Sequence, residues 1–269
     1  MDALEVLHVD NHVLAVRKPA GMPCVPDASG DESLFDRARD WIERRYDKPG
    51  RAFLGVVHRL DRPVSGVVVF GRTSKGAARL TAAFAEQRTA KLYWGIADAA
   101  AIPAGGPGRG ELRQHLWKDR AKNRVLVSEA GRRDAKLAVT GWRLVERAAG
   151  TGGRHGAGRA LHALRPATGR SHQLRVAMAT LGRPLLGDLR YGPGPALEDR
   201  SVALHARALL VPHPTAGHRL LLVARPPELP VWEFECCAGA RSGAHEVEAG
   251  DVAGALDVEA LLERWGGAG

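Results

Sequence analysis

A short run between two apolar segments gathers side chains that could carry out nucleophilic chemistry. It contains His58, Arg59, Asp61, Arg62 and Ser65, which supply an imidazole, two guanidiniums, a carboxylate and a hydroxyl. A carboxylate between guanidiniums stays ionised, because nearby positive charge favours its charged form. Asp61 is therefore a candidate nucleophile or general base.

Two other interpretations of this run stay open. Asp61 could be held in a structural ion pair with an arginine, since such pairs have the same residue types as a reactive site. His58, Asp61 and Ser65 could instead form a hydrolase triad. No G-x-S-x-G elbow surrounds Ser65, and triad members seldom lie so close in sequence, so this second alternative is the weaker one.

A second dense run spans residues 164–175 and holds Arg170, His172, Gln173 and Arg175. A helix is expected over residues 171–181, with Ser171 as its cap. The start of a helix next to two guanidiniums favours an anion, because its free N–H groups and dipole add to the positive charge.

The histidines of this chain are also possible metal ligands by type. His172, His205 and His213 follow no known ligand spacing, and the sequence has no C-x-x-C pair and no H-E-x-x-H. We therefore predict no metal site.

Many strands and few helices are expected to position these runs. The first run lies between expected strands over residues 53–57 and 67–70, which are rich in valine. Lys91 and Tyr93 alternate with Leu92 and Trp94 along another strand, so they share one face of it. Helices are expected over residues 33–46 and 74–87, capped by Ser33 and Ser74. Further strands are expected over residues 5–9, 13–16, 90–97, 111–117, 124–129, 136–144 and 219–224.

Charge points to a polyanionic partner. The 269 residues carry a formal net charge of +9 and a pI of about 10.0, which favours nucleic acid or an anionic membrane surface. The first 237 residues carry +13 and residues 238–269 carry −4. No apolar run approaches the roughly 20 residues that span a bilayer, and no signal peptide is evident, so a cytoplasmic protein is expected.

The two dense runs together resemble one known family, the RluA-type pseudouridine synthases. The H-R-L-D-R-x-x-S-G run at residues 58–66 resembles the family signature, and L-x-P-x-T-G-R-x-H-Q-L-R at residues 164–175 resembles a second motif. Lys18-Pro19-Ala20-Gly21, Lys91-Leu92-Tyr93 and residues 181–188 and 204–206 match further motifs in the same order. The resemblance covers residues 5–235 and is to the compact members that lack an S4 domain. Val64 and Ala177 depart from the family pattern.

The resemblance implies an α+β fold: a large, mixed, mostly antiparallel sheet flanked by helices, with a central active-site cleft. It implies isomerisation of uridine to pseudouridine in structured rRNA or tRNA. Asp61 would be the catalytic nucleophile, Tyr93 would stack on the base, Arg175 would pair with the aspartate, and Arg59 would enter the RNA where the uridine is flipped out. The other matched residues are expected to contact RNA, namely His58, Arg62, Lys18, Lys91, Arg170, His172 and Gln173.

The isomerisation gains and loses no atoms, so the resemblance implies no cofactor. A monomer without an obligate protein partner is expected. Residues 1–237 are expected to form the catalytic domain, and residues 238–269 an acidic tail that is either a solvated extension or a mask over the basic face. A non-catalytic RNA-binding or RNA-chaperone protein on the same fold is the alternative function.

Overall fold

The computed structural model describes residues 4–47, 49–149, 158–238 and 240–247. Two compact units divide the chain. Unit 1 takes the described residues within 1–90, 206–227 and 239–269, and unit 2 takes those within 91–205 and 228–238.

Unit 1 is built on a sheet in which β1, β2, β4 and β10 are neighbours in that order, with β3 beside β4, β11 beside β10 and β12 beside β11. The pairs β1–β2, β2–β4, β3–β4, β10–β11 and β11–β12 are antiparallel. These strands are Val6–Val9 (β1), Val13–Lys18 (β2), Gly55–Val56 (β3), Ser65–Gly71 (β4), Leu204–Pro212 (β10), Arg219–Val223 (β11) and Gly243–Val247 (β12).

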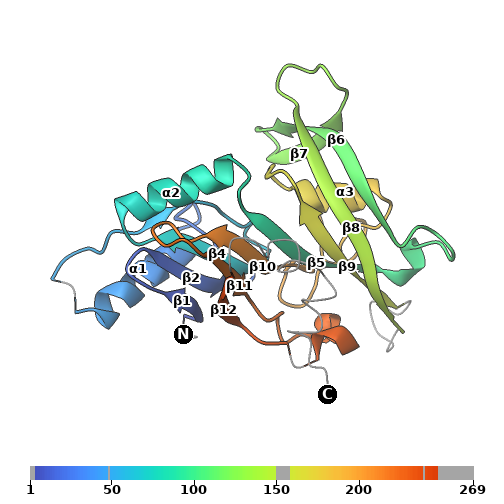
Figure 1. The fold of residues 1–269 in the computed structure, drawn as a ribbon. Coiled ribbons are helices and arrows are strands. Elements are labelled where there is room, and N and C mark those ends of the chain that lie inside the picture. Colours follow the sequence, from blue (N-terminus) through green and yellow to red (C-terminus); the bar gives the residue numbers. More distant parts are fainter. Residues whose placement is uncertain (1–3, 48, 150–157, 239, 248–269) are drawn as a thin grey trace. The chain divides into compact units, whose positions relative to one another are not determined.

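The core of unit 1 explains why its central strands are nearly continuous apolar runs. All seven residues of β4 are buried, so both of its faces are covered. Helix α2 (Ser74–Ala85) packs on β4 and contributes Leu80 to the core, and Figure 1 shows it lying along the strands of this unit. The main cluster consists of Leu7, Val13, Ala15, Val67, Val69, Leu80, Leu209, Val211, Leu220, Leu222 and Ala224.

Side chains cap both helices of unit 1. Helix α1 (Leu34–Arg45) begins as expected, because the Ser33 hydroxyl accepts a hydrogen bond from the main-chain N–H of Asp36. The predicted cap of α2 was wrong by one residue. The Thr73 hydroxyl accepts from Gly76 N, so Ser74 is already the first helical residue.

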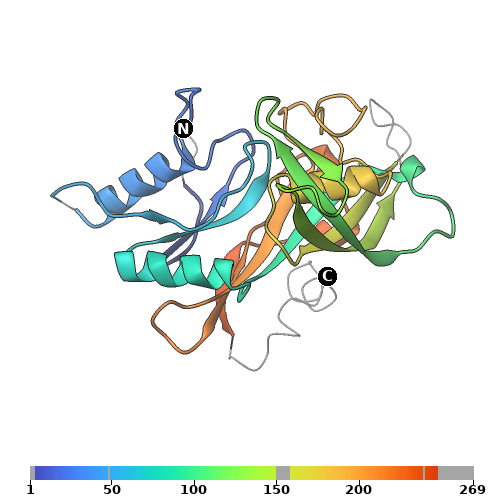
Figure 2. The same cartoon turned by 90° about the horizontal axis from the view of Figure 1, so that it is seen from above.

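Unit 2 is an antiparallel sheet with the strand order β5, β9, β8, β6 and β7. Helix α3 (Gln173–Thr180) packs against β7, β8 and β9, and it lies on the strands of this unit in both views (Figures 1 and 2). The strands are Ala90–Asp98 (β5), Arg109–Asp119 (β6), Arg124–Ser128 (β7), Lys136–Ala148 (β8) and Arg159–Pro166 (β9).

The expected α+β class is confirmed, and most expected strands are present. On β5, Leu92 and Trp94 are buried while Lys91 and Tyr93 are half-buried, as the alternation predicts. Among the described residues, no helix has the length and apolar character that crossing a membrane requires.

The expected tail begins with ordered structure. Strand β12 lies beyond residue 238 and pairs with β11, which the sequence did not predict. The buried Arg207 guanidinium donates to the carbonyls of Ala224 (2.7 Å) and Arg241 (3.2 Å) and so fixes the chain just before β12. Residues 248–269, which hold the rest of the expected tail, lie outside the described residues, and the domain boundary stays a prediction.

Candidate active site

Asp61 lies on a fixed loop at the head of β4 in unit 1. Leu60 is buried and donates its N–H to the Cys24 sulfur at 3.2 Å, while Val64 N donates to the Asp61 carbonyl at 3.0 Å. The Asp61 side chain is half-buried. The loop is therefore held on both sides of the carboxylate.

Gly66 lets the strand after this loop pack closely. Its φ of +119° lies in the region that L side chains avoid, and a Cβ there would collide with the main chain of Ala206 on β10. Glycine at this position therefore allows β4 and β10 to lie side by side directly after the Asp61 loop.

Lys18 is held inside unit 1, and its predicted contact with RNA stays a prediction. Its side chain is fully buried, and its Nζ donates to the carbonyls of Pro19 (2.8 Å), Met22 (2.6 Å) and Arg62 (3.0 Å). All three ammonium protons therefore have main-chain acceptors. Lys18 joins the loop that follows β2 to the loop that carries Asp61.

Burial lowers the pKa of Lys18 from 10.5 to about 8, and the nearby Asp61 charge partly opposes this. The unfolded chain then holds more protons than the folded chain between pH 8 and 10.5, so the contribution of Lys18 to the free energy of unfolding rises with pH through that window. The three carbonyls limit the effect, since they bond best to the charged amine.

Lys18→Met is expected to lower the free energy of unfolding at pH 7 by about 2 kcal/mol, because three buried carbonyls lose a donor. The gap to the wild-type protein should widen by about 1–2 kcal/mol between pH 7.5 and 10. Urea unfolding at several pH values measures both quantities. The exposed Lys75→Met is the control; a gap for Lys18→Met that narrows with pH would show that the buried amine is not the source.

Three further residues of the first run take different positions. Arg59 is exposed, as expected for a residue that enters RNA. The Arg62 guanidinium bonds to the Ser29 hydroxyl (2.9 Å) and to the Asp31 carboxylate. The predicted RNA contact of His58 stays a prediction, and the structure shows a partly buried ring with contacts inside unit 1. Its Nε2 accepts from Val69 N at 2.9 Å, and its ring stacks on Phe84 with centroids 4.6 Å apart.

Unit 2 holds Tyr93 and Lys91 on one face of β5. Tyr93 is half-buried and lies opposite Leu164 on β9. The Lys91 ammonium lies beside Gly169 of the second motif, where an added Cβ would be 3.7 Å from Nζ. Burial lowers the pKa of Lys91. An amine and a phenol therefore lie together on this strand next to the second motif.

Arg175 is the most firmly held residue of the second motif. Its Nε and Nη2 donate to Asp188 Oδ2 (2.8 Å) and Oδ1 (2.7 Å), and the side chains are only 7% and 1% exposed. Asp188 Oδ1 also accepts from the main-chain N–H groups of Arg190 and Tyr191. Sequence reasoning missed Asp188 as a site residue, although G-D-x-x-Y-G at residues 187–192 marks it.

Tyr191 joins this ion pair to the start of α3 and to β7. Its hydroxyl bonds to His172 Nδ1 at 2.7 Å and accepts from Val125 N at 2.8 Å, and the Arg175 guanidinium lies 5.2 Å from its ring centroid. Burial raises the pKa of Tyr191. The predicted cap of α3 was wrong, because α3 begins at Gln173 after His172, which has a φ of +50° and gives no side-chain cap.

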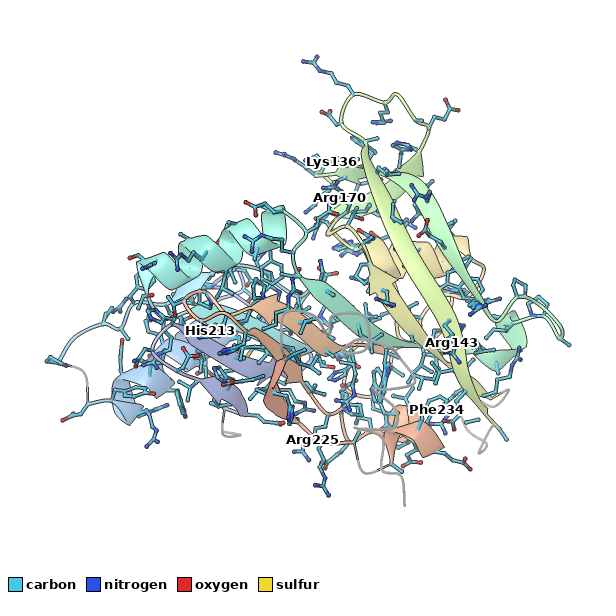
Figure 3. The ribbon with its side chains drawn as sticks, viewed as in Figure 1. Lys136, Arg143, Arg170, His213, Arg225 and Phe234 are labelled. Atoms are coloured by element: carbon cyan, nitrogen blue, oxygen red, sulfur yellow. The ribbon has the colours of Figure 1, made fainter. Side chains whose placement is uncertain are left out.

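Gln173 is held inside unit 2 by hydrogen bonds at both ends of its amide. It is buried, and its amide nitrogen donates to Val139 O (2.9 Å) and Thr140 Oγ1 (3.0 Å), while its oxygen accepts from Thr168 and Arg170 N. These bonds fix the motif, and the predicted RNA contact of Gln173 stays a prediction. The exposed Arg170, labelled in Figure 3, donates its Nε to Leu137 O at 3.0 Å.

The candidate metal ligands have other contacts. His172 bonds to Tyr191, the His205 ring lies 5.7 Å from that of Trp232, and His213 Nε2 bonds to Asp10 at 3.0 Å. Within the described part of the chain, no group of three or more His, Cys, Asp or Glu side chains is placed to hold a metal ion. Asp61 belongs to unit 1, whereas Tyr93 and Arg175 belong to unit 2. Pairing of Arg175 with Asp61 stays a prediction.

Comparison with known proteins supports the function that the motifs imply. Residues 12–180 match the RNA pseudouridylate synthase family. The dual-specificity RNA pseudouridine synthase RluA of Escherichia coli O6:H1 is 35% identical over 226 residues, which cover 82% of this chain and 92% of that protein. The ribosomal large subunit pseudouridine synthase D of Xylella fastidiosa is 32% identical over 240 residues, with coverages of 84% and 66%.

A solved structure shows the same fold. Human RNA pseudouridylate synthase domain containing 1 superposes with a TM-score of 0.68 at 23% identity, covering 97% of this chain and 94% of that chain. These similarities favour the enzyme over the non-catalytic RNA-binding alternative. The chain therefore belongs to the RNA pseudouridylate synthase family, is of the RluA type, and is an enzyme that isomerises uridine in RNA.

Proposed function

We propose that Asp61 is the nucleophile of this isomerisation and that the target uridine lies in rRNA or tRNA and is flipped out of its stack. The position of Asp61 carries the proposal. It is half-buried at the head of β4, on a loop that Lys18 and Cys24 hold from beneath. A carboxylate held in this way meets its substrate with little loss of conformational freedom.

The chemistry explains why one carboxylate is enough. In uridine the base is joined to the ribose through nitrogen, and in pseudouridine it is joined through carbon, so one bond breaks and another forms within the same nucleotide. A carboxylate that bonds to the sugar or to the base splits this exchange into two easier steps. The proton that leaves the base carbon needs an acceptor, and Tyr93 is the residue that we assign to the base and to this late step.

The need to reach the base inside folded RNA is the basis for the roles that we assign to the other residues. A base within folded RNA must leave its stack before a side chain can reach it, and an inserted group can fill the gap. Arg59 is exposed two residues before Asp61 and supplies such a group. Arg175 is assigned to pair with Asp61, and Lys91, Arg170 and His172 are assigned to the RNA around the uridine.

The class of RNA follows from the charge and the relatives. The net charge of +9 suits a phosphate backbone. One relative is named as a ribosomal large subunit enzyme, which supports rRNA, and another is named as dual-specificity, which supports more than one kind of target. A monomer that works in the cytoplasm remains part of the proposal.

Mapping pseudouridine in total RNA tests the proposal. Cells that lack this gene are compared with the same cells restored by the wild-type gene or by Asp61→Ala. We expect one or a few sites in rRNA or tRNA to disappear on deletion and to return only with the wild-type gene. Sites that return with Asp61→Ala would exclude Asp61 as the nucleophile, and return of none with either gene would exclude these RNAs as targets.

A further inference from the structure

One face of the hairpin that β6, β7 and β8 form in unit 2 carries apolar side chains, and no helix among the described residues of this unit packs on it. Antiparallel register places Trp117 opposite Leu126 and His115 opposite Leu137, and residues directly opposite point to the same face. Neighbouring residues point to the other face, where Leu116, Val125 and Ala138 form a cluster with Val176 of α3. We name the first set, together with Arg132, the outer hairpin face: His115, Trp117, Leu126, Arg132 and Leu137.

The outer hairpin face exposes aliphatic side chains together with an indole ring and a guanidinium. Leu126 and Leu137 are 39% and 40% exposed, and Trp117 is half-buried beside them. The exposed Arg132 guanidinium lies over the Trp117 ring, with Cζ 3.7 Å from the ring centroid. A guanidinium that lies over an indole ring is partly ordered before any ligand arrives, and guanidinium and indole planes are groups on which a nucleobase can stack.

The turn between β7 and β8 is hollowed, and its lining residues are Val127, Ser128, Glu129, Ala130, Gly131 and Arg132. Arg132 therefore lines the hollow and also stacks on Trp117.

The positive charge around the outer hairpin face indicates which class of ligand it binds. Residues 109–136 contain nine Lys or Arg and four Asp or Glu, a formal charge of +5, and all nine cationic side chains are exposed. Lys136 and Arg170 lie near each other at the same end of the unit, as the labels in Figure 3 show. Exposed aromatic and guanidinium planes within a cationic rim are the features that bind unpaired nucleotides.

We propose that the outer hairpin face binds a single-stranded segment of the substrate RNA, outside the target uridine, by stacking a base on the Arg132–Trp117 pair. This inference rests on the proposed function, since the ligand belongs to the same RNA. The face is opposite to the one on which α3 and its Arg175 lie, so it supplies contacts that the catalytic motifs do not. An RNA segment fits better than a protein partner, because positive charge borders the apolar groups.

Kinetics and binding with two variants test the proposal. Arg132→Gln removes an exposed charge and its stacking plane, and Trp117→Leu removes the ring beneath it. Arg45→Gln, an exposed arginine at the end of α1, is the matched control. The substrate is total RNA from cells that lack the gene, and the binding probe is a short oligouridine with 5-iodouridine for photo-crosslinking. Asp61→Asn is measured alongside.

We expect both variants to raise the apparent KM for RNA by about fivefold to tenfold with kcat unchanged. Arg132→Gln should also lower the slope of log Kd against log salt by about 0.7, the share of one phosphate contact in single-stranded RNA. The crosslinked peptides should include Trp117. A KM and salt slope equal to those of Arg45→Gln would overturn the proposal while leaving the enzyme's function intact. Activity that survives in Asp61→Asn would refute the proposed nucleophile whatever the hairpin binds.

Discussion

Replacing Asp61 by asparagine is expected to reduce pseudouridine formation by at least about 10⁴-fold, because an amide of the same shape is a far weaker nucleophile. The loss should lie in the chemical step. RNA affinity should stay within about twofold of the wild-type protein, since the cationic surface is untouched. Single-turnover release of tritium from RNA labelled at uridine C5 measures the chemistry, and filter binding measures the affinity.

A matched variant separates loss of the nucleophile from loss of charge. Asp40 is an exposed carboxylate on α1, and Asp40→Asn should leave both rate and affinity unchanged. If Asp61→Asn loses RNA binding as steeply as it loses rate, Asp61 holds the substrate or the loop and does not react. If it keeps the wild-type rate, another group supplies the nucleophile.

Local patterns predicted local structure well. Ser33 and Asp36 lie three residues apart, and the structure shows the cap that this spacing predicts. The alternation along residues 91–94 placed Leu92 and Trp94 in the core correctly. Errors arose where two neighbouring hydroxyls could serve, as with Thr73 and Ser74, because sequence does not fix which residue takes the non-helical conformation.

Residue type did not reveal which polar side chains face inward. Lys18 and Gln173 belong to the motifs and were assigned to RNA, yet both are buried and bonded to main-chain atoms. Their acceptors include carbonyls 44 and 34 residues away, at Arg62 and Val139, so only the folded chain defines them. Some motif residues thus hold the motif in place from inside the fold.

Strand β12 is a second feature that the sequence alone did not predict. Its sequence, GAHEV, begins with small and polar residues and lies within an acidic region, so composition favoured an extension without structure. Pairing with β11 supplies the main-chain hydrogen bonds that the short segment lacks alone. The side chains of such an edge strand therefore do little to show, in the sequence, that the segment forms a strand.

Replacing Asp188 by asparagine is expected to lower the free energy of unfolding by about 3 kcal/mol. The change leaves the Arg175 guanidinium buried without its counter-charge, at a pair whose side chains are 7% and 1% exposed. Activity should fall even where the protein is folded, because Asp188 receives both Nε and Nη2 and so sets the orientation of Arg175. Urea unfolding and single-turnover rates below the unfolding midpoint measure the two effects separately.

Two comparisons test whether the burial of the Arg175–Asp188 pair causes the expected loss of stability. The Arg113–Glu111 pair has the same residue classes at 2.8 Å but is 66% and 52% exposed, so Glu111→Gln should cost under about 1 kcal/mol. Adding Arg175→Met to Asp188→Asn should recover part of the lost stability, since the buried charge is then gone. Recovery of stability without recovery of rate would mean that the fold tolerates the loss of the pair, whereas the reaction needs the guanidinium itself. The opposite outcome is a loss of stability in the double variant that equals the sum of the losses in Asp188→Asn and Arg175→Met measured singly. That result would mean that the two side chains are not coupled, and that Tyr191 and the α3 backbone hold Arg175 in place.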